Sequence, residues 1–197
     1  MFRKKIVIGL IAGILLSLGF LYFTNTGRNI KRRIRMELIG MNLVESKKKP
    51  KEISETIPFD FEGTLLDFAG NKVDLKDFKG KTLFINVWAS WCGPCRIEMP
   101  YIQSLYDKVK TQPNLEFMLI AIDKDFEKSK SFINDKGFTF PVYHAHKGLN
   151  GFLTTQIIPL TVIVNQEGTV VYYLNGTNNF DNDDFRELLI STALTSK

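Results

Sequence analysis

The stretch "FINVWASWCGPCRIEMP", from Phe84 to Pro100, holds both cysteines and both tryptophans of a 197-residue chain. The two cysteines, Cys92 and Cys95, are separated by Gly93 and Pro94, and the sequence contains no other thiol. The reactivity of such a C-x-x-C pair depends on the local structure around it, because neighbouring backbone groups decide whether the thiols ionise and react.

The residues around the pair predict a junction between a strand and a helix. Thr82–Trp88 is a continuous apolar run, typical of a strand buried on both faces. A helix is predicted from Pro94 to about Lys110, so Cys92 lies near its start. Free backbone N–H groups and the helix dipole stabilise a thiolate there, and lower the pKa of cysteine from about 8.5 to roughly 3.5–7.5. Pro94 suits the first turn, and Gly93 allows another backbone to approach closely.

The spacing also allows the pair to switch between dithiol and disulfide. Cys95 lies about one helical turn from Cys92, close enough to bridge without large strain. We therefore expect the Cys92 thiolate to attack a substrate disulfide and the more buried Cys95 to resolve the mixed disulfide. The alternatives are a structural disulfide, which would constrain so short a loop little, and half of a zinc site completed by His144 and His146.

The charge of the chain is unevenly distributed. Residues 1–50 contain 11 Lys or Arg and 2 Asp or Glu, whereas residues 51–197 contain 15 and 19. The larger part is therefore mildly acidic, which argues against a nucleic-acid-binding domain, since that would carry its own basic face. The basic N-terminal part indicates a membrane surface instead.

An uncharged apolar run, Ile6 to Phe23, predicts an uncleaved signal anchor over residues 1–25. Residues 26–52 form a predicted basic juxtamembrane linker, whose apolar positions follow near-helical spacing. This linker lies on the membrane or forms a solvated helix, and the sequence favours neither. Basic residues flank the run on both sides, and the two groups favour opposite orientations of the run across the membrane. They are Arg3, Lys4 and Lys5 before it, and Arg28, Lys31, Arg32, Arg33 and Arg35 after it.

The remaining residues, 53–197, predict one α/β domain in which strands and helices alternate and then a hairpin and a helix follow. Such an order predicts a mixed sheet covered on both sides. Besides Thr82–Trp88, the predicted strands are Leu115–Ile122, Leu160–Val164 and Thr169–Leu174, and the predicted helices are Phe126–Lys136 and Asp181–Leu194.

"FINVWASWCGPCRIEMP" resembles the active-site segment of thioredoxin-like proteins, and most closely that of the membrane-anchored TlpA/ResA-like thiol-disulfide oxidoreductases. The resemblance covers roughly Ile57 to Ala193. It implies a thioredoxin fold with a central mixed sheet flanked by helices, an N-terminal β extension and one preceding transmembrane helix. It also implies an inserted helix and strand, which would fall in Asp123–His144.

The resemblance assigns roles to individual residues. It makes Cys92 the nucleophile and Cys95 the resolving cysteine. Pro159 matches the cis-proline that faces the site in this fold, and the backbone of Ile158 would pair with the substrate chain. Leu160 departs from the small polar residue usual after this proline, so substrate contacts are expected to differ.

Four further positions carry over. Asn86 takes the place of the buried aspartate of plain thioredoxins, and Glu98 matches a carboxylate implicated in the redox chemistry of ResA-like proteins. Because Glu98 lies one turn past Cys95, it could relay a proton to that thiol; the alternative is a solvated helix residue. Trp91 is expected on the docking surface and Trp88 in the packing. The predicted substrate-binding set is Trp91, Gly93, Pro94, Ile158 and Pro159.

These residues predict an enzyme with no cofactor and no metal, which reduces protein disulfides outside the cytoplasm at the cell membrane. The resemblance implies a membrane electron donor, and apocytochrome c is one substrate of the family. The alternative is a Sco-like copper-delivery protein, a class that uses a wider cysteine spacing and a distal histidine. The side of the membrane rests on the resemblance, because the flanking charges do not decide it.

Overall fold

The computed structural model describes Gly13, residues 56–155 and residues 157–195. The predicted anchor, residues 1–25, lies outside the described residues except for Gly13, and the predicted linker, residues 26–52, lies outside them entirely. No helix within the described ranges has the length and apolar character needed to cross a membrane. Both N-terminal predictions therefore stay predictions.

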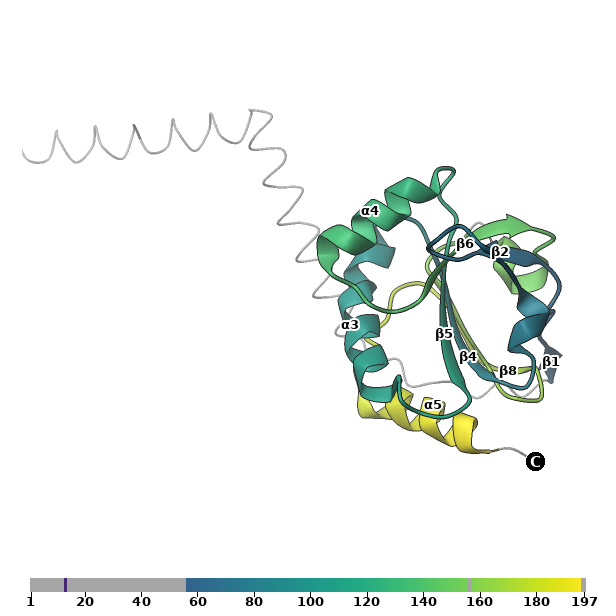
Figure 1. Ribbon diagram of the computed structural model, residues 1–197. Helices are drawn as coiled ribbons and strands as arrows, with labels where there is room; N and C mark the ends of the chain where they lie inside the picture. Colours follow the sequence, from purple (N-terminus) through teal and green to yellow (C-terminus); the bar gives the residue numbers. More distant parts are fainter. Residues whose placement is uncertain (1–12, 14–55, 156, 196–197) are drawn as a thin grey trace, which may run out of the picture. The chain divides into compact units, whose positions relative to one another are not determined.

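The described domain is built on an eight-stranded mixed sheet in the order β1-β8-β7-β4-β5-β6-β2-β3 (Figure 1). The central strand β4 pairs in parallel with β5 and antiparallel with β7. The strands are β1 (Ile57–Pro58), β2 (Thr64–Leu66), β3 (Lys72–Asp74), β4 (Thr82–Trp88), β5 (Leu115–Ala121), β6 (Val142–Lys147), β7 (Leu160–Val164) and β8 (Thr169–Asn175).

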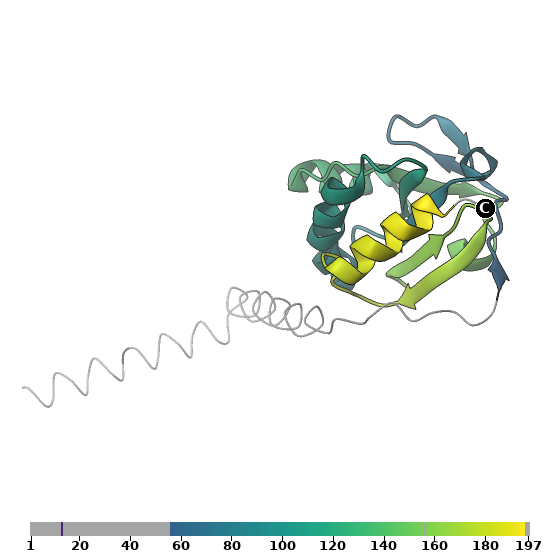
Figure 2. The ribbon, with the colours of Figure 1, turned by 90° about the horizontal axis from the view of Figure 1, so that it is seen from below.

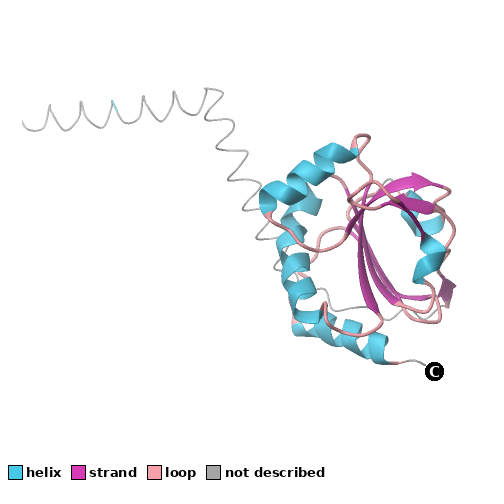
Figure 3. Cartoon of the chain, viewed as in Figure 1, coloured by secondary structure: helices cyan, strands magenta, loops and turns pink. Residues whose placement is uncertain are grey.

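The two faces of the sheet are covered differently (Figures 2 and 3). The helices α3 (Gly93–Val109), α4 (Phe126–Lys136) and α5 (Asp183–Leu194) lie on one face. The strands β4, β5 and β6 are parallel and lie in that order across the sheet. Because both connections proceed in the same direction across the sheet, right-handed crossovers place α3 and α4 on the same face. Two short 3₁₀ helices, η1 (Leu75–Phe78) and η2 (Gly151–Thr154), help to cover the other face.

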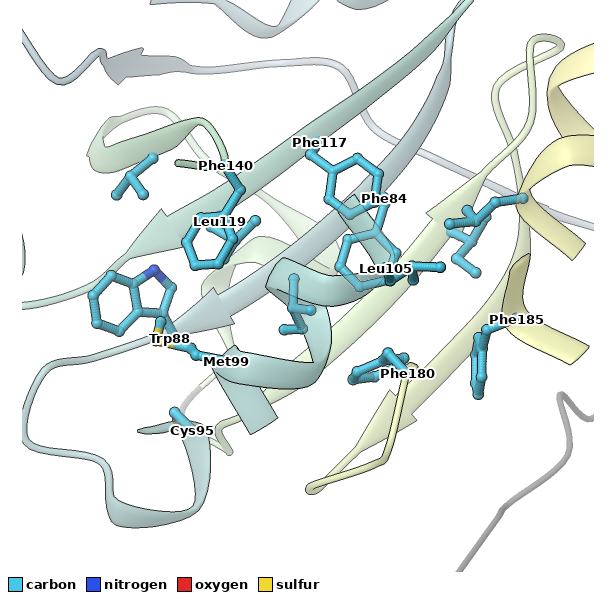
Figure 4. Packing of buried hydrophobic residues seen from close by; sticks show 14 of the residues in the cluster. Phe84, Trp88, Cys95, Met99, Leu105, Phe117, Leu119, Phe140, Phe180 and Phe185 are labelled. Carbon is cyan, nitrogen blue, oxygen red and sulfur yellow. The ribbon is translucent and has the colours of Figure 1, made fainter. Parts of the chain in front are cut away.

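The central strand β4 is buried along its whole length, as its continuous apolar sequence predicts. Its alternate side chains contribute to two cores, one on each face of the sheet. In the helical core, the rings of Phe84 and Phe117 stack with centroids 4.6 Å apart. Trp88, Met99 and Cys95 belong to the same cluster (Figure 4), so the resolving cysteine is part of the packed interior.

The predicted elements of the domain are confirmed, with ends shifted by a few residues. The β7–β8 hairpin and the inserted α4 and β6 are present. The helix α4 ends at Gly137, whose φ of 68° is the left-handed conformation that favours glycine. The N-terminal extension divides between the two edges of the sheet: β1 pairs with β8, whereas the β2–β3 hairpin pairs with β6.

One glycine in this extension gives a stability prediction. Gly63 has a φ of +119°, and a Cβ atom there would lie 2.8 Å from Leu149 Cδ2 and 2.9 Å from the Gly148 carbonyl oxygen. We expect Gly63→Ala to lower the free energy of unfolding by about 1–3 kcal/mol, measured by urea denaturation. Gly70→Ala is the matched control, because Gly70 has a φ of +91° but no heavy atom within 4 Å. Equal losses in both variants would mean that the close contact contributes nothing.

Candidate functional site

The C-x-x-C pair lies at the start of α3, as the sequence predicts. Cys92 is the N-cap residue in extended conformation, and the Cys95 backbone N–H donates to its sulfur at 3.2 Å. The two cysteines form a disulfide, with their Cα atoms 5.3 Å apart. Cys95 is fully buried, whereas Cys92 retains 5% exposure. An approaching thiol or disulfide therefore meets Cys92 first.

The segment before β7 faces this disulfide. The Ile158–Pro159 peptide bond is cis, as the resemblance implies, and the Ile158 carbonyl oxygen lies 4.0 Å from Cys92 Sγ. The Gly176 N–H donates to the Pro159 carbonyl at 2.7 Å, which ties this segment to the end of β8. Leu160, which replaces the small polar residue of the family, is buried at the start of β7.

Two apolar side chains stand exposed beside the disulfide. Trp91 is 68% exposed and Ile157 is 64% exposed, although both are large and apolar. Trp88, in contrast, is completely buried and packs against Phe132 with ring centroids 5.8 Å apart. The two tryptophans thus occupy the positions expected from the sequence, one on the surface and one in the core.

One helical turn past Cys95 in α3 lies a buried carboxyl group. Glu98 is inaccessible to solvent, and its two oxygens accept from Asn86 Nδ2 at 2.9 Å and from the Asn178 backbone N–H at 3.2 Å. Burial raises the pKa of Glu98 from 4.5 to about 8, although both hydrogen bonds act to lower it. This carboxyl group can therefore hold or release a proton near neutral pH. The alternative, a solvated helix residue, is wrong.

Sequence reasoning missed two residues of this buried polar group. Thr161 faces Asn86 across the β4–β7 pair and accepts from Asn86 Nδ2 at 3.0 Å. A threonine within the apolar run of β7 was a usable signal, since buried polar side chains need partners. Asn178 lies in the loop after β8, and no periodicity in that polar loop could have placed it beside Glu98.

The Asn86 hydrogen bond gives a second prediction. Because the Asn86 amide stabilises the ionised form of Glu98, Asn86→Leu should raise the pKa of Glu98 further above 8. Hydrogen bonds to charged groups contribute about 1.5–3 kcal/mol, so the expected rise is about one to two pH units. Carbon-detected NMR titration of the glutamate carboxyl group measures it. Thr161→Val keeps the Asn86 amide and is the control; an unchanged pKa in Asn86→Leu would contradict the argument.

A second buried carboxylate holds the active-site loop against the inserted segment. Asp123 accepts from Ser90 N–H at 2.9 Å, from Ser90 Oγ at 2.6 Å and from Ser129 Oγ at 2.7 Å. His144 Nε2 donates to the Asp123 carbonyl oxygen at 2.7 Å, and its ring stacks on Phe126. Asp123 thus joins the residues before Cys92 to α4 and β6.

The histidines do not assemble with other ligands. His144 is engaged by Asp123, and His146 is exposed near the end of β6. In the ranges that the structure describes, no three His, Cys, Asp or Glu side chains are grouped so that they could hold a metal ion. The Sco-like copper-delivery alternative stays a prediction.

Comparison with known proteins gives consistent matches. Residues 52–189 match the family described as Redoxin. The thiol-disulfide oxidoreductase ResA of Bacillus cereus (strain ATCC 10987 / NRS 248) is 35% identical over 143 residues, which cover 70% of this chain and 80% of that protein. ResA of Bacillus subtilis (strain 168) is 32% identical over 114 residues, covering 57% and 63%.

A solved structure has a similar fold. The thioredoxin domain of a thiol-disulfide oxidoreductase from Bacteroides vulgatus superposes with a TM-score of 0.51 at 23% identity. The match covers 75% of this chain and 99% of that domain. At this identity the likeness concerns the fold alone, and it agrees with the mixed sheet and flanking helices described above.

Proposed function

Because this chain belongs to the Redoxin family and is a thiol-disulfide oxidoreductase related to ResA, we propose that it reduces disulfide bonds of proteins outside the cytoplasm. The observation that carries the proposal is the Cys92–Cys95 disulfide at the N-terminus of α3, with the buried Glu98 one helical turn further along. A pair at a helix start favours thiolate chemistry, and the carboxyl group of Glu98, with a pKa of about 8, can exchange a proton near neutral pH.

The reaction consists of two exchanges. The Cys92 thiolate attacks one sulfur of the substrate disulfide, that bond breaks, and the leaving sulfur departs as a thiolate that takes up a proton. The Cys95 thiolate then attacks Cys92 Sγ, which releases the second substrate thiol and closes the Cys92–Cys95 disulfide. The substrate gains two electrons and two protons, and the cysteine pair supplies the electrons.

We assign the proton of the second exchange to Glu98. Cys95 must lose its proton before it can attack, and its full burial in the disulfide form favours proton transfer to a neighbouring group over direct transfer to water. Glu98 lies one helical turn further along α3, and its pKa of about 8 suits exchange with a thiol.

Substrate binding is assigned to the residues around the disulfide. The backbone of Ile158 would pair with the substrate chain, since its carbonyl already faces Cys92. Pro159 fixes that segment, and the exposed Trp91 supplies apolar contact. Gly93 and Pro94 shape the helix start.

The cellular setting extends the proposal. We place the chain in the membrane through residues 1–25, with the domain on the extracytoplasmic side and a membrane protein as electron donor. The 18-residue uncharged run supports the anchor. Apocytochrome c is one candidate substrate. In whole cells, a thiol reagent that cannot cross the membrane should label Cys92 after mild reduction; labelling only after lysis would contradict this placement.

Insulin reduction tests the activity. With dithiothreitol supplied as the electron donor, the full chain should make insulin precipitate faster than dithiothreitol does alone, and a rate equal to that of dithiothreitol alone would contradict the proposal. The direction of electron transfer is tested by measuring the reduction potential of the Cys92–Cys95 pair in equilibrium with glutathione buffers. Related C-x-x-C proteins span about −270 mV to −120 mV, so a potential near the lower end supports a reductase and one near the upper end supports an oxidase.

A further inference from the structure

The turn that carries Cys92 is held from the side by a buried carboxylate. This turn spans Ala89 to Cys92, and the Cys92 backbone N–H donates to the Ala89 carbonyl at 3.1 Å. Inside it, Ser90 donates to Asp123 twice, from its backbone N–H at 2.9 Å and from its hydroxyl at 2.6 Å. Trp91, the remaining residue of the turn, is 68% exposed and packs little. Ser90, rather than Trp91, therefore fixes the path of the turn.

Asp123 itself has a fixed position. It follows β5, and the Ile122 N–H donates to the Trp88 carbonyl at 2.9 Å, so the pairing of β4 with β5 continues up to its neighbour. The Asp123 carbonyl oxygen accepts from His144 Nε2 at 2.7 Å, which links it to β6. Its side chain is 3% exposed and also accepts from Ser129 Oγ on α4 at 2.7 Å. The active-site turn is thus attached to a rigid part of the sheet.

This attachment matters most when the disulfide is open. In the oxidised protein the bond to Cys95 fixes the sulfur of Cys92. In the dithiol that bond is absent, and the position of Cys92 Sγ depends on the turn before it. The Cys95 backbone N–H donates to this sulfur at 3.2 Å. A thiolate is stabilised by such a donor and by the helix dipole, and both effects fall off over a short distance.

We propose that Asp123 is a positioning residue of the exchange reaction, which holds Cys92 at the N-cap of α3 through Ser90 in the reduced protein. If the turn loosens, the N–H contact to the sulfur weakens, so the pKa of the Cys92 thiol rises and less thiolate is available for attack. Asp123 acts through the turn and takes no part in the bonds that form and break. The inference rests on Cys92 as the attacking sulfur of the proposed function.

A test of this inference has to keep the charges around the turn constant, because a change of charge shifts the pKa of a nearby thiol whatever the geometry. The charged residues that share a hollow with Trp91 or lie at the start of α3 are Asp123, Lys124, Asp125, Lys128, Arg96 and Glu98. Replacing Asp123 would alter a charge as well as the turn. The test therefore removes single hydroxyl groups and leaves every charge in place.

The experiment compares Ser90→Ala with Ser129→Ala in the reduced full chain. Each variant removes one hydroxyl that donates to Asp123, at 2.6 Å and 2.7 Å, but only the first belongs to the turn. The pH dependence of alkylation by iodoacetamide gives the pKa of Cys92, with the modified cysteine identified by mass spectrometry. Ser90→Ala should lower the thiolate fraction about threefold at a pH below the pKa, a rise of about half a pH unit, whereas Ser129→Ala should leave it unchanged.

Thermal unfolding supplies the structural reference. Both variants lose one hydroxyl hydrogen bond to the same buried carboxylate, so both should lose a similar amount of stability, and only Ser90→Ala should change the Cys92 pKa. An equal pKa in the two variants, whether shifted or not, or a larger shift in Ser129→Ala, would overturn the inference. If the wild-type chain did not reduce insulin, the proposed function would fail, yet the alkylation comparison would still decide whether Asp123 positions Cys92.

Discussion

Replacing Cys92 with serine should reduce insulin reduction to the rate of dithiothreitol alone, a loss of essentially all enzymatic activity. A serine hydroxyl forms no disulfide, so the first exchange cannot begin. Cys95→Ser should behave differently, because Cys92 can still attack the substrate. This variant should accumulate a mixed disulfide with the substrate, visible on a non-reducing gel or by mass spectrometry. The difference between the variants follows from exposure, since Cys92 is partly accessible and Cys95 is fully buried.

A control variant tests whether the cysteine replacements cause misfolding. Both cysteines contact the helical core, so either replacement could lower stability. The double variant Cys92→Ser/Cys95→Ser should form no mixed disulfide, and its circular dichroism spectrum should match that of the reduced wild type. If Cys92→Ser retained catalysis, or if Cys92→Ser rather than Cys95→Ser trapped the substrate, the roles assigned to the two sulfurs would be wrong.

The strand–helix junction was predictable because its determinants are local. The apolar run of β4, the proline in the first turn and the pair of cysteines all lie within a few turns of chain, so their geometry follows from short-range rules. The cis peptide at Pro159 needed the family resemblance, since an X-Pro bond is cis only about 5–6% of the time.

The buried polar group around Glu98 was only partly predictable. Glu98 falls in phase with the buried side chains of α3 (Cys95, Met99, Ile102, Leu105 and Val109), so its burial could have been inferred from helical periodicity. Its hydrogen-bond partners come from β4 and from the loop after β8, which are distant in sequence. Such contacts depend on tertiary packing, and a single sequence does not report them.

The burial of Glu98 should make stability strongly dependent on pH. Its pKa is about 8 in the folded protein and about 4.5 in the unfolded chain, so between these values the folded state binds one more proton. The free energy of unfolding then falls as pH rises, by about 1.36 kcal/mol per pH unit for this group. The stabilisation is complete below pH 4.5 and is lost as pH rises through 8. Over the whole window the loss is on the order of 5 kcal/mol.

Glu98→Gln isolates this contribution, because glutamine has the same shape and does not titrate. Urea unfolding of the oxidised protein at several pH values should give a difference between wild type and variant that changes steadily from pH 4.5 to pH 8. Outside that window the difference should be constant, since the group binds the same number of protons folded and unfolded. Glutamine has a single carbonyl oxygen, so it can accept from only one of the two donors that Glu98 satisfies. This loss lowers the free energy of unfolding of the variant by the same amount at every pH, so it does not change how the difference depends on pH. Parallel curves across the window would show that Glu98 is ionised in the folded state, and a proton held beside Cys95 would then have to come from another group.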